Sequence, residues 1–150
     1  MNAPETAIGA RRILFVDDEP FVLTGIRRSI MALTDEWELH FANSGAEALE
    51  MCDRTRFDLI VTDARMPVME GAELLQRLRD RPDTAEIPTI MLTGYAEESL
   101  RRKAIEAGVI EFLNKPIDTD ELVIRLRNVL RLKSIADELR RRNEEVVESS

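Results

Sequence analysis

Four short runs of apolar residues constrain the fold of this 150-residue chain more than any other feature. A strand with one face in water alternates apolar and polar side chains, whereas a strand covered on both faces is apolar throughout. Because none of the four runs alternates, we predict that they are buried strands of a parallel sheet, joined by a weaker fifth strand. The runs lie at residues 13–16, 59–61, 90–92 and 112–113, and the weaker candidate lies at 37–42.

Segments with helical periodicity separate the predicted strands. Pro20 suits the first position of a helix, Asn43 or Ser44 suits the cap of the next helix, and Gly108 suits a helix C-terminus. Short strands that alternate with helices in this way are typical of α/β proteins. The sequence therefore predicts a doubly wound, five-stranded parallel sheet with five helices, the last of them extended.

The final segment differs from the rest because no proline or glycine interrupts it after Thr119. Its apolar residues recur in alternating steps of three and four, the pattern of a coiled-coil seam, and Asn143 falls where a buried amide favours a parallel pair. The alternative is an amphipathic helix that packs only on its own domain. The seam is short, and its flanking residues Lys133, Arg140 and Arg142 carry like charges. The seam consists of Val129, Leu132, Ala136, Leu139, Asn143 and Val146.

Length and charge limit the organisation and the function. We expect a flexible segment at residues 1–11, one domain at 12–130, and a helical extension at 131–150 that is a candidate linker to an output domain. The net charge of −8 argues against binding to nucleic acid. No apolar stretch approaches the roughly 20 residues that cross a bilayer, and Cys52 is the only cysteine, so we expect a cytoplasmic protein without a membrane partner.

Polar side chains follow four of the predicted strands. Asp17 and Asp18 follow the first strand, Asp63 the third, Thr93 the fourth and Lys115 the fifth. Because the carboxyl ends of parallel strands meet at one crevice, these five side chains are expected to share a pocket.

Three carboxylates in one pocket require a cation. Two unit charges 4 Å apart repel by about 4 kcal/mol at an effective dielectric constant near 20. Oxygen ligands favour Mg²⁺, which commonly takes phosphate oxygens as further ligands. Asp63 is the candidate nucleophile for an aspartyl phosphate, and Lys115 can neutralise the incoming charge. Taken alone, Asp63 would be assigned as a helix cap or turn residue. The presence of Asp17, Asp18, Thr93 and Lys115 at equivalent strand ends favours the nucleophile instead.

Four motifs, in order and each at a strand end, carry a resemblance to a known family. They are Ile13-Leu14-Phe15-Val16-Asp17-Asp18-Glu19-Pro20, Asp63-Ala64-Arg65-Met66-Pro67-Val68-Met69-Glu70-Gly71, Leu92-Thr93-Gly94-Tyr95 and Phe112-Leu113-Asn114-Lys115-Pro116. From about residue 12 to 130 the chain resembles the receiver domains of response regulators in two-component signalling. That family has a flavodoxin-like fold.

The resemblance implies a site and a partner. It implies that Asp63 takes a phosphoryl group from a sensor histidine kinase, a phosphotransfer protein or a small phosphodonor. It also implies that Asp18, Asp63 and the backbone carbonyl of Arg65 ligate Mg²⁺, with Asp17 acting through water. Autodephosphorylation would then be the only hydrolysis that the domain performs.

The resemblance further implies a switch. Thr93 moves toward the phosphoryl group and Phe112 turns into the space that it leaves, which changes the surface of the fourth helix, fifth strand and fifth helix. Phe112 lacks the hydroxyl of the tyrosine that is familiar at this position. Homodimers would form through that same surface or through the C-terminal helix.

Two alternatives remain beside a receiver that controls an output through its last helix. The first is a stand-alone phosphotransfer or adaptor receiver, because nothing in these 150 residues resembles an output domain. The second is a phosphatase of the haloacid dehalogenase type, which carries a general-acid aspartate two residues after its nucleophile. Arg65 occupies that position here, so we do not expect a turnover enzyme.

Overall fold

The computed structural model describes residues 10–94 and 98–149, and the side chains of residues 10–94 and 98–144. Most of the predicted flexible segment and Tyr95 therefore lie outside the described residues. The elements, in chain order, are β1 (Arg11–Val16), α1 (Pro20–Leu33), β2 (Trp37–Ala42), α2 (Gly45–Arg54), β3 (Leu59–Asp63), α3 (Gly71–Arg79), β4 (Thr89–Thr93), α4 (Glu98–Glu106), β5 (Glu111–Asn114) and α5 (Thr119–Ser149).

The five strands form one parallel sheet in the order β2-β1-β3-β4-β5. The predicted α/β fold with a five-stranded parallel sheet is confirmed. Strand β2 lies on one side of β1, whereas β3, β4 and β5 lie on the other side. A ligand crevice is expected at such a switch point, outside the carboxyl ends of β1 and β3.

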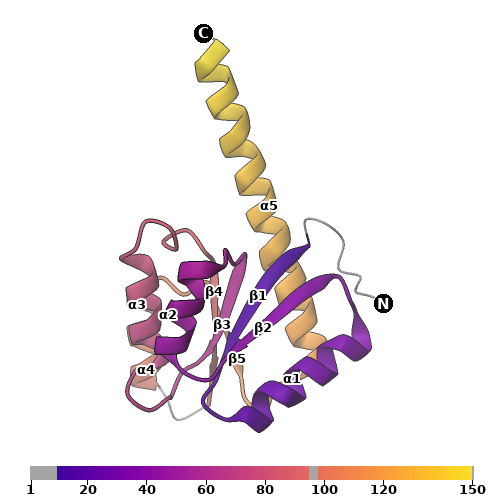
Figure 1. Ribbon diagram of the computed structural model, residues 1–150, viewed down its shortest axis with the longest axis vertical. Helices are drawn as coiled ribbons and strands as arrows, with labels where there is room; N and C mark the ends of the chain where they lie inside the picture. The colour runs from indigo at the N-terminus through magenta and orange to yellow at the C-terminus, as the bar shows by residue number, and fades with distance from the viewer. Residues whose placement is uncertain (1–9, 95–97, 150) are drawn as a thin grey trace.

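Two apolar cores cover the two faces of the sheet. On one face Leu14, Val16 and Met91 pack against α2, α3 and α4, and on the other Phe15 and Ile90 pack against α1 and α5. Figure 1 shows α1 and α5 on one side of the sheet and the other three helices on the opposite side. Because β1, β3 and β4 are covered on both faces, their sequences lack the alternation of a half-exposed strand.

The residues expected to start and stop helices do so. Pro20 is the first residue of α1. The Ser44 hydroxyl accepts the backbone N–H of Glu47, so Ser44 is the cap of α2. Gly108 follows α4 with φ of +90°, a left-handed conformation that costs glycine little because it has no Cβ.

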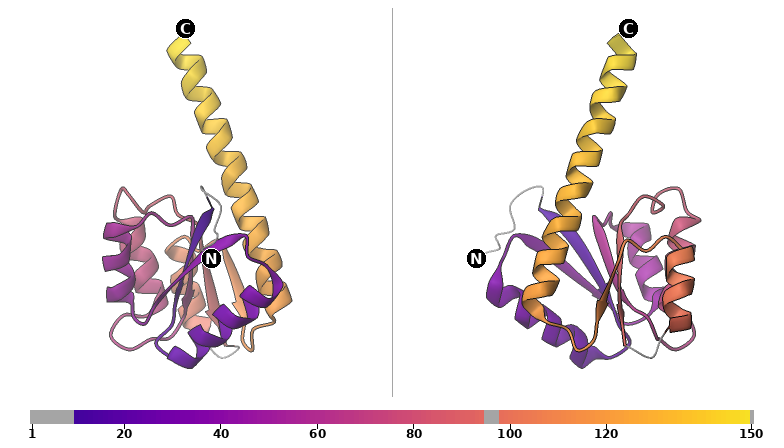
Figure 2. Two further views of the ribbon diagram at one scale, coloured as in Figure 1. Left: turned by 45° about the vertical axis from the view of Figure 1, so that its right-hand side comes forward. Right: turned by 180° about the vertical axis from the view of Figure 1, so that it is seen from behind.

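The last helix is continuous over 31 residues and extends far beyond the sheet (Figures 1 and 2). Its first half is held by burial of Leu122, Leu126 and Val129 against β1, β3, β4 and α1. The extended last helix predicted from the sequence is therefore present.

Candidate functional site

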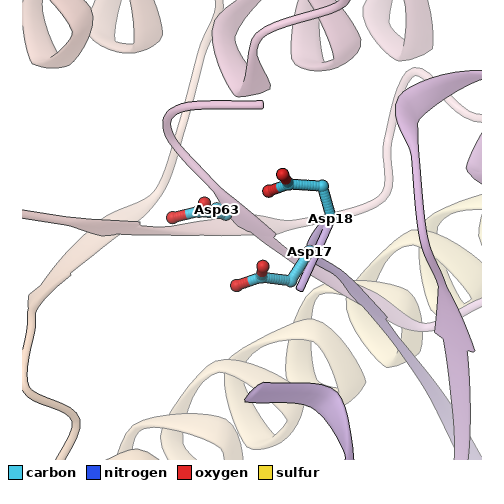
Figure 3. A group of neighbouring side chains, drawn as sticks. All are labelled: Asp17, Asp18 and Asp63. Carbon is cyan, nitrogen blue, oxygen red and sulfur yellow. The ribbon is translucent and has the colours of Figure 1, made fainter. Parts of the chain in front are cut away.

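Three carboxylates converge at the carboxyl ends of β1 and β3. One oxygen from each of Asp17, Asp18 and Asp63 lies within 4.8 Å of the others, as Figure 3 shows for the three side chains. Asp17 and Asp63 are buried, at 1% and 5% exposure, whereas Asp18 is more open to water. The tertiary structure thus gathers the acidic residues that were expected to share a pocket.

Asp17 carries its charge in an unfavourable, buried environment. One of its oxygens accepts the backbone N–H of Glu19 at 2.9 Å, but its buried Oδ2 has no hydrogen-bond partner among the described residues. Burial, followed by the nearby charge of Asp63, raises the pKa of Asp17 to about 6, although the bond from Glu19 acts against this. A buried oxygen without a donor is available to accept a hydrogen bond or to bind a cation.

Lys115 supplies a positive charge at the end of β5. Its Nζ lies 2.5 Å from Oδ1 of Asp63. Burial opposes the charge on this ammonium, but the hydrogen bond and charge of Asp63 raise the pKa of Lys115 above its ordinary value. Lys115 precedes Pro116 through a cis peptide bond, and its backbone N–H donates to the carbonyl of Thr93 at 2.8 Å. Lys115 is therefore a permanent cation held beside Asp63.

Thr93 ends β4 on the same edge of the sheet. Its side chain is fully buried, and its hydroxyl has no hydrogen-bond partner within the part of the chain that the structure describes. An unpaired buried hydroxyl costs free energy, so the hydroxyl of Thr93 is available to donate a hydrogen bond.

Arg65 and Phe112 lie at the borders of the site. The side chain of Arg65 is exposed in the loop that follows Asp63. Phe112 lies on β5 with its ring partly buried against the core, and the guanidinium of Arg101 sits 4.8 Å from the ring centre. Phe112 thus lies between the core and the surface of α4.

Gly71, the last residue of the second motif, supports the backbone of the site. A Cβ at this position would lie 2.3 Å from the carbonyl oxygen of Asp63 and 2.9 Å from Cε of Met91. The N–H of Gly71 donates to the carbonyl of Ala64 at 3.0 Å. A glycine shortly after the candidate nucleophile was the available signal for this close approach.

Val68 occupies a strained position in the same loop. Its φ is +68°, and the N–H of Met69 donates to the carbonyl of Pro67 at 2.7 Å, so Val68 is the central residue of a γ-turn. A β-branched residue with positive φ is rare because its Cβ crowds the backbone. The sequence offered no signal for this turn, since glycine or asparagine normally marks such a position.

We expect Val68→Gly to raise the free energy of unfolding by about 1 kcal/mol, because relief of backbone strain outweighs the added freedom of the unfolded chain. Val68 is fully exposed, so no packing is lost. Urea unfolding measures the change. Val68→Ala is the matched control, since it keeps the Cβ and should recover little of this stability. If the glycine variant is no more stable than the alanine variant, the backbone at Val68 is not strained.

The donor set fits a hard divalent cation. The three side chains offer only carboxylate oxygens, which Mg²⁺ prefers, and Oδ2 of Asp17 has no hydrogen-bond partner among the described residues. Lys115 compensates only part of the negative charge. The site is thus suited to a metal ion and to an anion that shares it.

Comparison with known proteins identifies the family of this chain. The family model described as the response regulator receiver domain matches residues 13–127. This chain belongs to the response regulator receiver domain family. The two-component resemblance inferred from the four motifs is thereby confirmed, and the chain is a receiver domain of the kind found in response regulators and hybrid kinases.

Relatives and solved structures give the same result. The receiver is 38% identical over 130 residues to the cyclic di-GMP phosphodiesterase response regulator RpfG of Xanthomonas campestris, which covers 87% of this chain and 34% of that protein. The signal receiver domain of an HD domain-containing protein from Pseudomonas fluorescens has a TM-score of 0.76, with 31% identity, 83% of this chain and 97% of that chain covered.

A third neighbour is described with a metal ion. The receiver domain of sensor histidine kinase PA1611 from Pseudomonas aeruginosa has a magnesium ion coordinated in its active site cleft. Its TM-score is 0.72, with 28% identity, 81% of this chain and 98% of that chain covered. The present chain thus spans about a third of RpfG but nearly all of an isolated receiver. Across residues 10–94 and 98–149, no helix is long and apolar enough to cross a membrane.

Proposed function

We propose that Asp63 is the phosphorylation site of this receiver. The observation that carries the proposal is the convergence of Asp17, Asp18 and Asp63 with the ammonium of Lys115, 2.5 Å from Asp63. An Asp63 oxygen attacks the phosphorus atom, and the bond from phosphorus to the donor breaks. The donor, an imidazole of a phosphohistidine or the acetate of acetyl phosphate, leaves with the electron pair.

Asp18, Asp63 and the backbone carbonyl of Arg65 would hold Mg²⁺, with Asp17 linked to it through water. When bound, the metal neutralises charge on the transferring phosphoryl group. Lys115 pairs with a second phosphoryl oxygen from the β5 side, which lowers the repulsion between the incoming anion and the carboxylates. The unpartnered oxygen of Asp17 supports this assignment.

The same site suggests how phosphorylation is transmitted. The unpaired hydroxyl of Thr93 gains an acceptor when Asp63 carries a phosphoryl group. Movement of Thr93 would open space beside β5 for the ring of Phe112, which now lies partly buried under Arg101. We propose that this two-state change alters the surface of α4, β5 and α5 or the C-terminal helix and so controls an output.

A sensor histidine kinase or a phosphotransfer protein is the proposed phosphodonor. Phe21, on the first turn of α1 and close in sequence to Asp17 and Asp18, is 91% exposed. An exposed aromatic ring beside an acidic pocket suits contact with a protein donor. We further propose that the domain has no external substrate to turn over, and that the acidic chain does not bind nucleic acid.

We also propose a cytoplasmic location for the receiver and a role for its C-terminal helix. Cys52 is buried and unpaired, which fits the reducing conditions of the cytoplasm. Residues 131–150 suit a linker to an output domain, while a stand-alone adaptor that passes phosphate on remains the second candidate. The length of relatives such as RpfG favours the first.

We expect acetyl phosphate and Mg²⁺ to add one phosphoryl group to the protein and none to Asp63→Asn. The amide of asparagine is a poor nucleophile, so the loss should be complete. Intact mass measures the gain, and thermal unfolding shows that the variant is folded. An equal gain in Asp63→Asn would exclude Asp63 as the site. No gain in the parent, under conditions that label another receiver, would indicate a scaffold.

A further inference from the structure

Three apolar side chains stand in water on the part of α5 that extends beyond the domain. Leu132, Ile135 and Leu139 are 64%, 51% and 56% exposed. We call these three residues the outer stripe. They recur in steps of three and four, so they lie on one side of the helix. Figures 1 and 2 show this stretch of helix rising away from the sheet. Leu132, at the base of the stripe, also borders a groove between α5 and the domain, whereas Ile135 and Leu139 do not line it.

The outer stripe shares Leu132 and Leu139 with the seam expected from the sequence but contains Ile135 in place of Ala136. Val129, which begins that seam, is 4% exposed because it packs in the core of its own domain. Ala136 faces a groove of about 650 Å³ between α5 and the loops that precede β3 and β4. Two of the six residues of the expected seam, Val129 and Ala136, therefore face the domain itself. At 3.6 residues per turn, the outer stripe lies roughly a quarter of a turn away from that face.

This rotation also changes where the charges lie. Lys133 and Arg140, which flank the seam expected from the sequence, line the groove instead. Lys133 pairs with Asp137 at 2.8 Å, and Arg140 pairs with Glu86 of the domain at 3.4 Å. Two of the three like charges that argued against self-association are thus paired within one copy, on a face that a second helix need not touch. The third, Arg142, lies 3.7 Å from Glu138 outside the groove.

The edge of the outer stripe has charges of both signs. Arg131 and Glu138 lie on the same side of the stripe, seven residues apart, and Glu138 already interacts with Arg141 and Arg142. A second copy would bring an identical apolar row with an edge that includes both a positive and a negative charge. Such a surface complements itself, as an isologous contact requires.

We propose that the outer stripe is a dimer interface whose occupant is the same stripe of a second copy of this chain. The apolar row forms the centre of the contact, and the edge residues Arg131 and Glu138 set its charge pattern. The face of α5 that carries Lys133, Ala136 and Arg140 stays on its own domain. This arrangement explains why residues 131–144 of the helix expose their large apolar side chains on one side.

Two neighbouring residues separate this interface from the seam expected from the sequence. Ile135 is central to the outer stripe but lies at the side of the expected seam, whereas Ala136 is central to that seam and faces the groove. Both residues are exposed, so glutamate at either position leaves the core of the domain unchanged. The full chain and its Ile135→Glu and Ala136→Glu variants form the test, with circular dichroism to show equal helix content.

Sedimentation equilibrium without a phosphodonor measures the association, so the result is independent of Asp63. We expect the parent to form a dimer, Ile135→Glu to weaken it by a factor of about 100 or more, and Ala136→Glu to change it by less than about threefold. A parent that stays monomeric at high protein concentration would overturn the proposal. So would a dimer that survives Ile135→Glu, or one that only Ala136→Glu disrupts.

Discussion

In the absence of divalent metal at pH 7, Asp17→Asn is expected to be more stable than the parent by about 3 kcal/mol. The pKa of Asp17 is near 6 in the folded protein, against an ordinary value of 3.8, chiefly because the side chain is buried. Keeping this group ionised in the fold is therefore costly. An asparagine can keep the bond from Glu19 while removing the charge next to Asp63.

The sign of the pH dependence follows from proton binding. Between about pH 4 and pH 6 the folded state holds a proton on Asp17 more tightly than the unfolded state does, so stability falls as pH rises through this range. The penalty is complete above pH 6. Urea unfolding of the parent and Asp17→Asn in EDTA, at several pH values, isolates this contribution as the difference between the two proteins.

Addition of Mg²⁺ at pH 7 provides the second half of the test. The metal should stabilise the parent, because it offsets the repulsion among the three carboxylates, and should stabilise Asp17→Asn less. Parallel pH profiles for the two proteins in EDTA would show that Asp17 carries no such penalty. Equal stabilisation of both by Mg²⁺ would show that Asp17 does not contribute to the metal site.

We expect Gly71→Ala to lower the free energy of unfolding by about 3 kcal/mol or more. The new methyl group would lie 2.3 Å from the carbonyl oxygen of Asp63 and 3.2 Å from Cα of Ala64. Both neighbours are backbone atoms of the strand end and loop that position the candidate nucleophile, so they cannot move aside as a flexible side chain would. Labelling by acetyl phosphate should fall as well, because relief of the clash displaces Asp63.

Gly25→Ala is the matched control for this prediction. Gly25 lies within α1, and a Cβ there would meet no atom within 4 Å. The same substitution should stabilise the protein by about 0.5–1 kcal/mol, because alanine favours the helix. Urea unfolding of both variants measures the contrast. A loss for Gly71→Ala no larger than the change for Gly25→Ala would mean that the loop accommodates the methyl group.

Much of the site could be read from the sequence because its chemistry is attached to strand ends. Asp17, Asp63, Thr93 and Lys115 each follow an apolar run, and a parallel sheet places the carboxyl ends of its strands on one edge. Residue type and order were therefore enough to predict that a metal and a phosphoryl group could share this edge. The same runs, apolar throughout, predicted strands covered on both faces.

Other features depended on distances that no local pattern encodes. Lys115 approaches Asp63 to 2.5 Å although the two residues lie far apart in the chain. The loop after Asp63 folds back so that Gly71 lies against the Asp63 carbonyl. Burial of the Asp17 oxygen without a partner also depends on the packed structure. The γ-turn at Val68 even opposes the preference of its residue. Backbone strain of this kind persists only where the surrounding structure holds it, so residue propensities cannot predict it.

The C-terminal helix shows most clearly which features follow from the sequence and which depend on tertiary packing. Its length and its steps of three and four follow from the sequence alone, because they need only the absence of breakers and the spacing of apolar residues. Which side of the helix is free could not be predicted, since a shift of one residue rotates the face by about 100°. Packing of Val129 into the core decided that question, and it turned Leu132, Ile135 and Leu139 toward water.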